Sequence, residues 1–569
     1  MDEQFLIVGA VALAIMITAS VFSRRTGVAT PLLLVALGIG ASYLPATPTV
    51  HVEPELVLAG VLPLLLYSSA VQLPVIDVRR NLSMISWLSI VMVIVSALAI
   101  GAVVHAIFPN ISFALATALG AVVSPTDAVA ATAIGHRVGL PPRLMSILEG
   151  ESLVNDASAL VLLRTAIAGL TVAGFSFGHT LLDFLWAVAG AGIIGFVVGL
   201  LTVRLRQSLD DPVLNTTISF AVPFVAYFPA EEMNTSGVLA VVVAGLATGA
   251  MGTRRFSARD RQTQATTWAT ISFILESSVF LAMGYQLPDL IDAARSETTI
   301  GEITGMVLIV VALLVAIRFL GLAWPAFAAR MSPEGRTEKT RARLGEFEEH
   351  IAAFEPSDER EENRLAWARR RLARGRADID FEEREPITGR GSLVLAWAGM
   401  RGVVTVAAAQ TIPNGTAHRD TIVLAAYFVA LVTLVLFGLT LPQLISRLDL
   451  RSVSEEEKRD AVQSLLRRIG ESAIDTLGPL EEQTVDGEPL DPALVARMKE
   501  RVLPRLVVGA RDKTPEPVRR DHMDLLQHRY LDAMRDALVA ERSIGAYRSA
   551  TYRAVESILD GLEQRQRLS

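Results

Sequence analysis

The sequence predicts an all-α polytopic membrane protein with a helical soluble tail. Of its 569 residues, 51% are hydrophobic and only 20% are charged, and the mean hydropathy is +0.43. A membrane-spanning helix needs about 20 predominantly apolar residues. Thirteen stretches meet this expectation, at about 4–22, 29–45, 55–75, 84–108, 112–134, 144–172, 180–203, 213–230, 235–252, 266–286, 303–328, 391–411 and 418–445.

Arginines in alternate loops predict the orientation of these spans. Positive residues concentrate in cytoplasmic loops, so the arginine-rich set of loops is expected inside and the N-terminus outside. With thirteen spans, the C-terminus is then cytoplasmic, and the expected location is the plasma (inner) membrane. The arginine-rich loops carry Arg24, Arg25, Arg79, Arg80, Arg137, Arg143, Arg204, Arg206, Arg254, Arg255, Arg259 and Arg261, and the exceptions in other loops are Arg295 and Arg419.

Composition divides the chain into a transmembrane domain at 1–445, with a cytoplasmic insertion at about 331–390, and a helical cytoplasmic domain at 446–569. The beginning Met-Asp-Glu-Gln lacks a basic n-region, so we expect the first apolar stretch to remain as a span. The absence of cysteine excludes disulfides and thiolate metal sites.

Both soluble parts are predicted to be helical. Charges of both signs from Arg360 to Arg371 indicate a helix in the insertion, for which a solvated linker and a regulatory contact are alternatives. In the tail, Ser454 and Glu457 form a capping-box pattern. Apolar positions at helical spacing follow, from Val462 to Leu477 and again from Leu525. Because acidic residues are mixed with the basic ones, no nucleic-acid surface is expected.

The run Ser124-Pro125-Thr126-Asp127 interrupts the fifth span. Proline removes a backbone donor and disfavours helix at the preceding residue, so we expect a broken helix here. Broken helices at membrane depth occur where they line a cavity or are buried in protein. Asp127 would begin the second half-helix, where the helix dipole favours a carboxylate. The alternative is a simple proline kink with a hydrogen-bonded acid.

The sixth span contains Glu149-Gly-Glu-Ser-Leu-Val-Asn-Asp156. Residues four apart share a helix face, so Ser152 lies with Asp156 and Glu151 with Asn155. A hydroxyl and a carboxylate are oxygen ligands suited to Na⁺. Carboxylates at membrane depth are costly, by about 2.5–3.5 kcal/mol, and usually functional. A self-satisfied polar cluster is the alternative.

Arginines in two later spans require buried anions. Arg401, in Gly399-Met-Arg-Gly402 of the twelfth span, is expected to pair with Glu151. Opposite charges in the tenth and eleventh spans, Glu276 and Arg318, suggest a second and mainly structural pair.

Together these motifs resemble the monovalent cation/proton antiporter family that includes bacterial NhaP proteins and animal sodium/proton exchangers. The resemblance covers about 1–445 and implies two inverted six-helix repeats, with spans five and twelve unwound and crossing, and a homodimer. It places the cation site on Thr126 (backbone carbonyl), Asp127, Ser152 and Asp156. Glu151 and Arg401 would form the buried ion pair. Related electrogenic antiporters carry two aspartates where this chain has Asn155-Asp156, so the resemblance implies electroneutral exchange.

The expected function is therefore antiport of a monovalent cation and H⁺, which compete for Asp156 during alternating access. Na⁺ is expected first, with Li⁺ and K⁺ open. No enzymatic activity, cofactor or nucleotide site is expected, since no Gly-rich loop with a following Lys-Ser or Lys-Thr occurs. An intramembrane aspartyl protease built on Asp127 and Asp156 lacks Tyr-Asp and Gly-x-Gly-Asp elements. A cation channel would need a pore loop or carbonyl filter.

Overall fold

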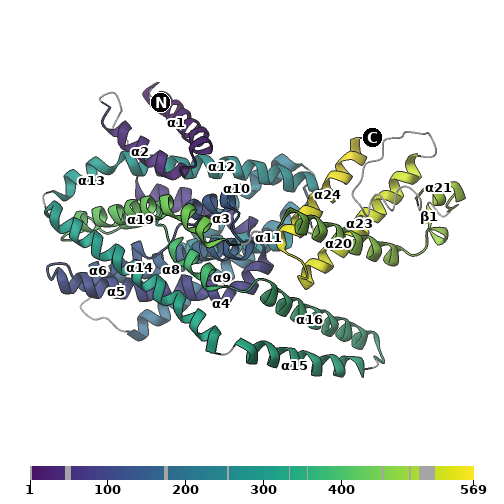
Figure 1. Cartoon of the computed structure of the whole chain (residues 1–569). Helices are drawn as coiled ribbons and strands as arrows, with labels where there is room; N and C mark the ends of the chain where they lie inside the picture. The colour runs from purple at the N-terminus through teal and green to yellow at the C-terminus, as the bar shows by residue number, and fades with distance from the viewer. Residues whose placement is uncertain are drawn as a thin grey trace. The chain divides into compact units, whose positions relative to one another are not determined.

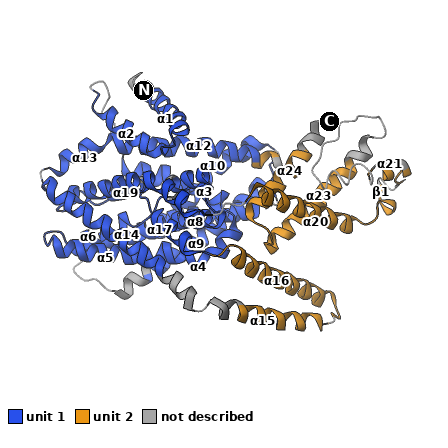
Figure 2. Cartoon of the chain, viewed as in Figure 1, with its two compact units in different colours: residues 1–256, 262–329, 387–452 blue, residues 257–261, 330–386, 453–569 orange. Residues whose placement is uncertain are grey.

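The computed structural model is helical except for one short hairpin (Figure 1). It describes residues 3–44, 53–171, 177–209, 211–252, 255–295, 297–331, 333–354, 356–450, 454–485, 488–498 and 520–568. These residues form two compact units (Figure 2): unit 1 comprises 1–256, 262–329 and 387–452, and unit 2 comprises 257–261, 330–386 and 453–569.

Unit 1 contains the apolar helices. In chain order they are α1 (Glu3–Thr26), α2 (Thr30–Ser42), the π-helix η1 (Leu56–Val61), α3 (Leu62–Gln72), α4 (Val75–Ser86), the π-helix η2 (Trp87–Val91), α5 (Met92–Ile107), α6 (Phe113–Val123), α7 (Ala128–Val138), α8 (Pro142–Thr171), α9 (Phe177–Arg206), α10 (Pro212–Glu232), α11 (Gly237–Gly252), α12 (Ala258–Tyr285), α13 (Leu287–Ala294), α14 (Ile300–Met331), α17 (Gly389–Trp397), α18 (Val403–Gln410) and α19 (Arg419–Leu448). Residues 258–261 of α12 and 330–331 of α14 belong to unit 2.

The predicted spans correspond to helical segments of this unit. Eight described helices are long and apolar enough to cross a membrane, and the shorter apolar helices lie at Thr30–Ser42, Leu56–Gln72, Phe113–Val123 and Gly237–Gly252. Two of the expected spans are interrupted: in the fifth, α6 is followed by α7, and in the twelfth, α17 is followed by α18. The total of thirteen crossings stays a prediction.

Two apolar clusters hold unit 1 together. The larger involves α5, α6, α8, α14, α17, α18 and α19, and the smaller joins α3, α10 and α11 with parts of α8 and α9. Small residues allow the closest approaches. A Cβ on Gly120 of α6, for example, would lie 2.5 Å from the carbonyl oxygen of Ala97 in α5. Helix α8 belongs to both clusters, which makes it a central element of the unit.

Unit 2 combines the insertion with the tail. Its elements are α15 (Pro333–Ala352), α16 (Glu359–Arg384), α20 (Glu455–Leu477), the 3₁₀ turn η3 (Leu480–Glu482), strands β1 (Thr484–Val485) and β2 (Glu488–Pro489), α21 (Pro492–Arg497), α23 (Arg520–Ile544) and α24 (Ser549–Leu568). The strands pair antiparallel, with Thr484 opposite Pro489. Helices α20, α23 and α24 bury a common apolar cluster. The predicted cap of α20 is present, since the Ser454 hydroxyl accepts a hydrogen bond from the Glu457 amide at 3.1 Å.

Candidate functional site

Two interrupted helices meet at the site. Helix α6 ends before Ser124-Pro125, and α7 begins after Asp127, whose side chain accepts a hydrogen bond from the Val129 amide at 2.8 Å. Residues 398–402 separate α17 from α18. The Asp127 amide donates to the carbonyl oxygen of Met400 at 2.7 Å, so the two extended segments contact each other. The expected break at Pro125 and the position of Asp127 at a helix start are confirmed.

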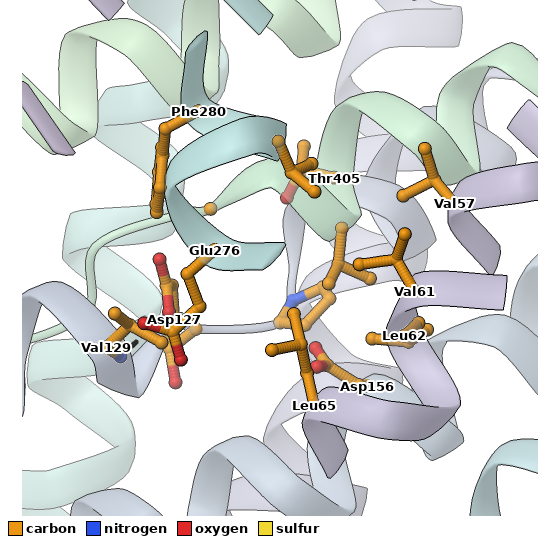
Figure 3. Close-up of a pocket in the computed structure, with 15 residues that line it drawn as sticks. Val57, Val61, Leu62, Leu65, Asp127, Val129, Asp156, Glu276, Phe280 and Thr405 are labelled. Carbon is orange, nitrogen blue, oxygen red and sulfur yellow. Dashed lines mark hydrogen bonds between the residues drawn. The ribbon is translucent and has the colours of Figure 1, made fainter. Parts of the chain in front are cut away.

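A cavity of about 70 Å³ opens beside this contact (Figure 3). Since roughly 10–15 Å³ suffices for one water, the cavity has room for a cation with part of its hydration shell. Three carboxylates line it, contributed by different helices: Asp127, Asp156 from α8 and Glu276 from α12. The other lining residues are Val57, Val61, Leu62, Leu65, Pro125, Thr126, Val129, Val279, Phe280, Gly402, Val404 and Thr405.

Asp156 is 7% exposed, and in the described part of the chain no hydrogen-bond donor contacts its carboxylate. Asp127 lies near enough to repel both Asp156 and Glu276 electrostatically. Figure 3 shows the side chains of Asp127 and Glu276 next to each other, with Asp156 on the other side of the cavity. Three like charges in a confined space require neutralisation, by protons or by a cation.

The hydroxyl of Thr126 joins the broken span to α8. It donates to Glu151 Oε1 at 2.9 Å and accepts from Asn155 Nδ2 at 2.9 Å. Asn155 also contacts the Thr126 carbonyl oxygen at 3.4 Å. Asn155 therefore stabilises the region where the two interrupted spans cross. Its side-chain amide also contacts the Thr126 carbonyl oxygen, which was expected to bind the cation.

The expected partner of Glu151 was wrong. Arg318 of α14, not Arg401, forms the ion pair: its Nη1 and Nη2 lie 2.6 and 3.0 Å from the two carboxylate oxygens of Glu151. Arg401 instead donates to the backbone carbonyl oxygens of Val123, at 2.9 Å from Nε, and of Gly399. Those carbonyls lie beside the helix breaks, which explains why a buried arginine is needed there.

The expected pairing of Glu276 with Arg318 was wrong for the same reason. Arg318 is occupied by Glu151 and by the carbonyl oxygen of Leu395, which its Nε and Nη2 contact at 3.1 and 3.0 Å. Glu276 is half-buried and faces the cavity. It is thus a third acidic group of the site rather than half of a structural pair.

The expected place of Ser152 among the cation ligands stays a prediction. The Ser152 side chain is half-buried. It is not among the described residues that line the cavity, whereas Asp156 and Thr126 are. Sequence reasoning overlooked Thr405, a hydroxyl that is 2% exposed and lines the cavity from α18. Its position three residues after Gly402 in the second interrupted span was the available signal.

A resident metal finds no support in this geometry. Within the ranges described, no three His, Asp or Glu side chains converge closely enough to hold one.

Comparisons with known proteins agree with this architecture. Residues 10–447 match the model of the sodium/hydrogen exchanger transmembrane family. A sodium, potassium, lithium and rubidium/H⁺ antiporter of Bacillus pumilus is 29% identical over 514 residues, covering 87% of this chain and 69% of the relative. The Na⁺/H⁺ antiporter ApNhaP of Aphanothece halophytica is 29% identical over 469 residues, covering 82% and 78%.

The fold is similar to that of the sodium proton antiporter MjNhaP1 from Methanocaldococcus jannaschii. The TM-score is 0.55 at 15% identity, over 78% of this chain and 99% of that one. The interrupted helices and acidic cavity define a membrane-embedded ion transporter. The chain belongs to the sodium/hydrogen exchanger family, and it is an integral membrane transporter rather than an enzyme. Nothing in these matches supports the protease or channel alternatives.

Proposed function

We propose that this protein exchanges a monovalent cation for H⁺ across the membrane, with Asp156 as the residue for which the two compete. The observation that supports this most is the distribution of partners among the buried carboxylates. Glu151 is neutralised by Arg318, and Asp127 accepts from the Val129 amide. Asp156 shares the cavity with Asp127 and Glu276, and no hydrogen-bond donor among the described residues contacts its carboxylate. A bare carboxylate in the membrane is unfavourable, so Asp156 changes access only when a cation or a proton neutralises it.

With Asp156 as the one carboxylate that is exchanged, and Asp127 and Glu276 keeping their charge through the cycle, the exchange is electroneutral, with one cation against one proton. Oxygen atoms from Asp156, Asp127 and Thr126 would surround the cation, with Ser152 of α8 as a further candidate ligand. Na⁺ is the first candidate cargo, and Li⁺ and K⁺ remain candidates because the Bacillus pumilus relative is named for all three. We propose no cofactor.

Arginine alternation supports an orientation in the plasma (inner) membrane with the N-terminus outside and the C-terminus cytoplasmic. We further propose a homodimer. Large apolar side chains on α9, including Trp186, Ile193 and Phe196, are exposed, and they need either lipid or a second copy to cover them.

The test is cation-driven proton flux in proteoliposomes, measured with Na⁺, Li⁺ and K⁺ at several pH values. Asp156→Asn should abolish the flux while the protein remains folded and dimeric. The control is Asp292→Asn, which removes an exposed carboxylate of α13 and should leave the flux unchanged. Flux that persists in Asp156→Asn would refute the assignment, and uncoupled cation flow without proton counterflux would favour a channel.

A further inference from the structure

The helical hairpin between α14 and α17 has one face that the transport mechanism does not use. Helix α16 begins at Asp358, whose side chain accepts from the Glu361 amide at 2.7 Å, and its first turn is acidic as the helix dipole favours. It packs on α15 through a small apolar cluster that includes Ile351, Leu365 and Leu372.

Ion pairs fix the rotation of α16 against α15. Arg341 of α15 lies 2.6 Å from Glu383, and Arg376 of α16 pairs with Glu348. Together with the buried leucines, these pairs determine which side of α16 points away from its partner helix. The hairpin therefore presents a defined outer surface.

That outer surface is basic and carries an exposed tryptophan. Arg360, Arg364, Trp367 and Arg371 follow one another at spacings of four, three and four residues, which places them on one face of a helix. Trp367 is 61% exposed, and the three arginines are exposed as well. The Arg371 guanidinium lies 5.4 Å from the centre of the Trp367 ring. Arg370 extends the same basic face, and the sequence 363–374 contains no acidic residue. We call Arg360, Arg364, Trp367, Arg370 and Arg371 the basic face.

Among the described residues, Arg360, Arg370 and Arg371 of the basic face have no ion-pair partner, and Arg364 interacts only electrostatically with Glu361 of its own helix. In the ranges that the structure describes, none of the four takes part in an ion pair, although Arg341, Arg376 and other arginines of unit 2 do. An exposed tryptophan among unpaired arginines differs from an ordinary solvated helix face, which mixes charges of both signs. Positive charge that acidic residues of the same helix compensate only at Arg364 indicates an anionic partner outside the chain.

We propose that the basic face binds the anionic phospholipid headgroups of the membrane in which the protein is embedded. Clusters of arginines on a helix adjacent to a span attract anionic lipid, and tryptophan favours the headgroup region, where its ring is apolar and its N–H remains hydrated. Residues 385–388 connect α16 to α17, so the chain tethers the hairpin to a predicted membrane span, and a helix rises about 1.5 Å per residue from that attachment. This binding goes beyond the proposed exchange reaction and does not depend on it.

The absence of native cysteine allows a direct test on the full-length protein. Asn363→Cys, on the outer side of α16, is labelled with a polarity-sensitive fluorophore, and the protein is reconstituted in phosphatidylcholine with and without phosphatidylglycerol. The emission should shift toward that of an apolar environment only with phosphatidylglycerol, and high salt should reverse the shift because exposed charges are screened. A label at Gln463→Cys, on the exposed face of α20, should not respond.

Removing the charges should remove the response. In the triple variant Arg364→Gln/Arg370→Gln/Arg371→Gln, the equilibrium between bound and free hairpin should fall by on the order of a hundredfold, at about fivefold for each arginine near an anionic surface. The matched control Arg459→Gln/Arg467→Gln/Arg553→Gln removes the same charge from exposed positions of α20 and α24 and should retain the shift.

Any of four outcomes would overturn the proposal. The first is an equal response with and without phosphatidylglycerol, and the second is a response that survives in the α16 triple variant. The third is a response that follows protein density at constant lipid composition, since the partner would then be a second copy. A response to soluble polyglutamate in pure phosphatidylcholine, with none to phosphatidylglycerol, would likewise replace the lipid by an acidic protein. None of these readouts involves transport, so they are independent of Asp156.

Discussion

Arg318 holds Glu151 through two hydrogen bonds, one to each carboxylate oxygen, at 2.6 and 3.0 Å. The pair is buried, with side-chain exposures of 9% and 1%. Because the same guanidinium contacts the carbonyl oxygen of Leu395 and Glu151 also accepts from Thr126, this one pair connects α14, α8 and both interrupted spans. It therefore acts as the structural centre of the site, one helical turn from Asn155 and Asp156.

Arg318→Ala should strongly destabilise the protein, because Glu151 would remain buried without its cation. Breaking a buried ion pair by removing one partner typically costs about 3–5 kcal/mol. Thermal unfolding in detergent measures the loss. The double variant Arg318→Met/Glu151→Gln should recover part of it, since it leaves no uncompensated charge. An Arg318→Ala protein as stable as the parent would contradict this role.

Arg401→Ala should destabilise the helix crossing by a different route. The carbonyl oxygens of Val123 and Gly399 would lose their donor, and an unsatisfied buried polar group costs about 1–3 kcal/mol. Glu151 lies near enough to interact electrostatically with Arg401 but forms no hydrogen bond with it, so the loss should depend only weakly on Glu151. Combined with Glu151→Gln, the effect of Arg401→Ala on the unfolding temperature should therefore change little. A large coupling between the two substitutions in the unfolding temperature would instead support the pairing of Arg401 with Glu151 that the sequence suggested.

Gly402→Ala should impair transport without comparable loss of stability. A Cβ at this position would lie 2.5 Å from Oδ2 of Asp127, so the carboxylate would have to move away from the cavity. We expect a higher KM for the cation, measured as cation-driven proton flux. Gly305→Ala in α14 is the matched control, because its Cβ meets no atom within 4 Å. An unchanged KM in Gly402→Ala would show that Asp127 does not contribute to the site.

Sequence reasoning succeeded where local chemistry decides the structure. Pro125 cannot continue a hydrogen-bonded helix, and Asp127 is a good cap, so the broken span followed from these two residues alone. The common face of Glu151 and Asn155 likewise follows from helix geometry, and both side chains reach Thr126.

It failed where the relative rotation of helices decides which groups meet. The sequence shows that buried Arg318 and Arg401 each need acceptors, but hydropathy does not reveal which face of α14 turns toward α8. Assigning Arg318 to Glu276 assumed that consecutive spans exchange charges, whereas Glu276 faces the cavity. Backbone carbonyls freed by an unwound segment were overlooked as partners of Arg401, since they leave no trace in residue type. Thr405 escaped notice because a threonine in an apolar run usually satisfies its own helix backbone.

Glu276→Gln tests whether the third carboxylate of the cavity carries charge through the transport cycle. Glutamine keeps the size of the side chain but removes one negative charge that attracts the cation. If Asp156 alone is exchanged, the variant should still transport, with a KM for the cation about three- to tenfold higher, as expected for losing one nearby charge in a partly hydrated site.

Exchange should be electroneutral in both proteins, which is measured by whether an imposed membrane potential changes the rate. Glu456→Gln, an exposed position of α20, is the control and should change neither quantity. A different result would be an exchange rate that depends on the membrane potential in the parent protein but not in Glu276→Gln. That result would show that Glu276 takes up a second proton. The exchange of one cation for one proton would then be wrong, even if Asp156 proved indispensable.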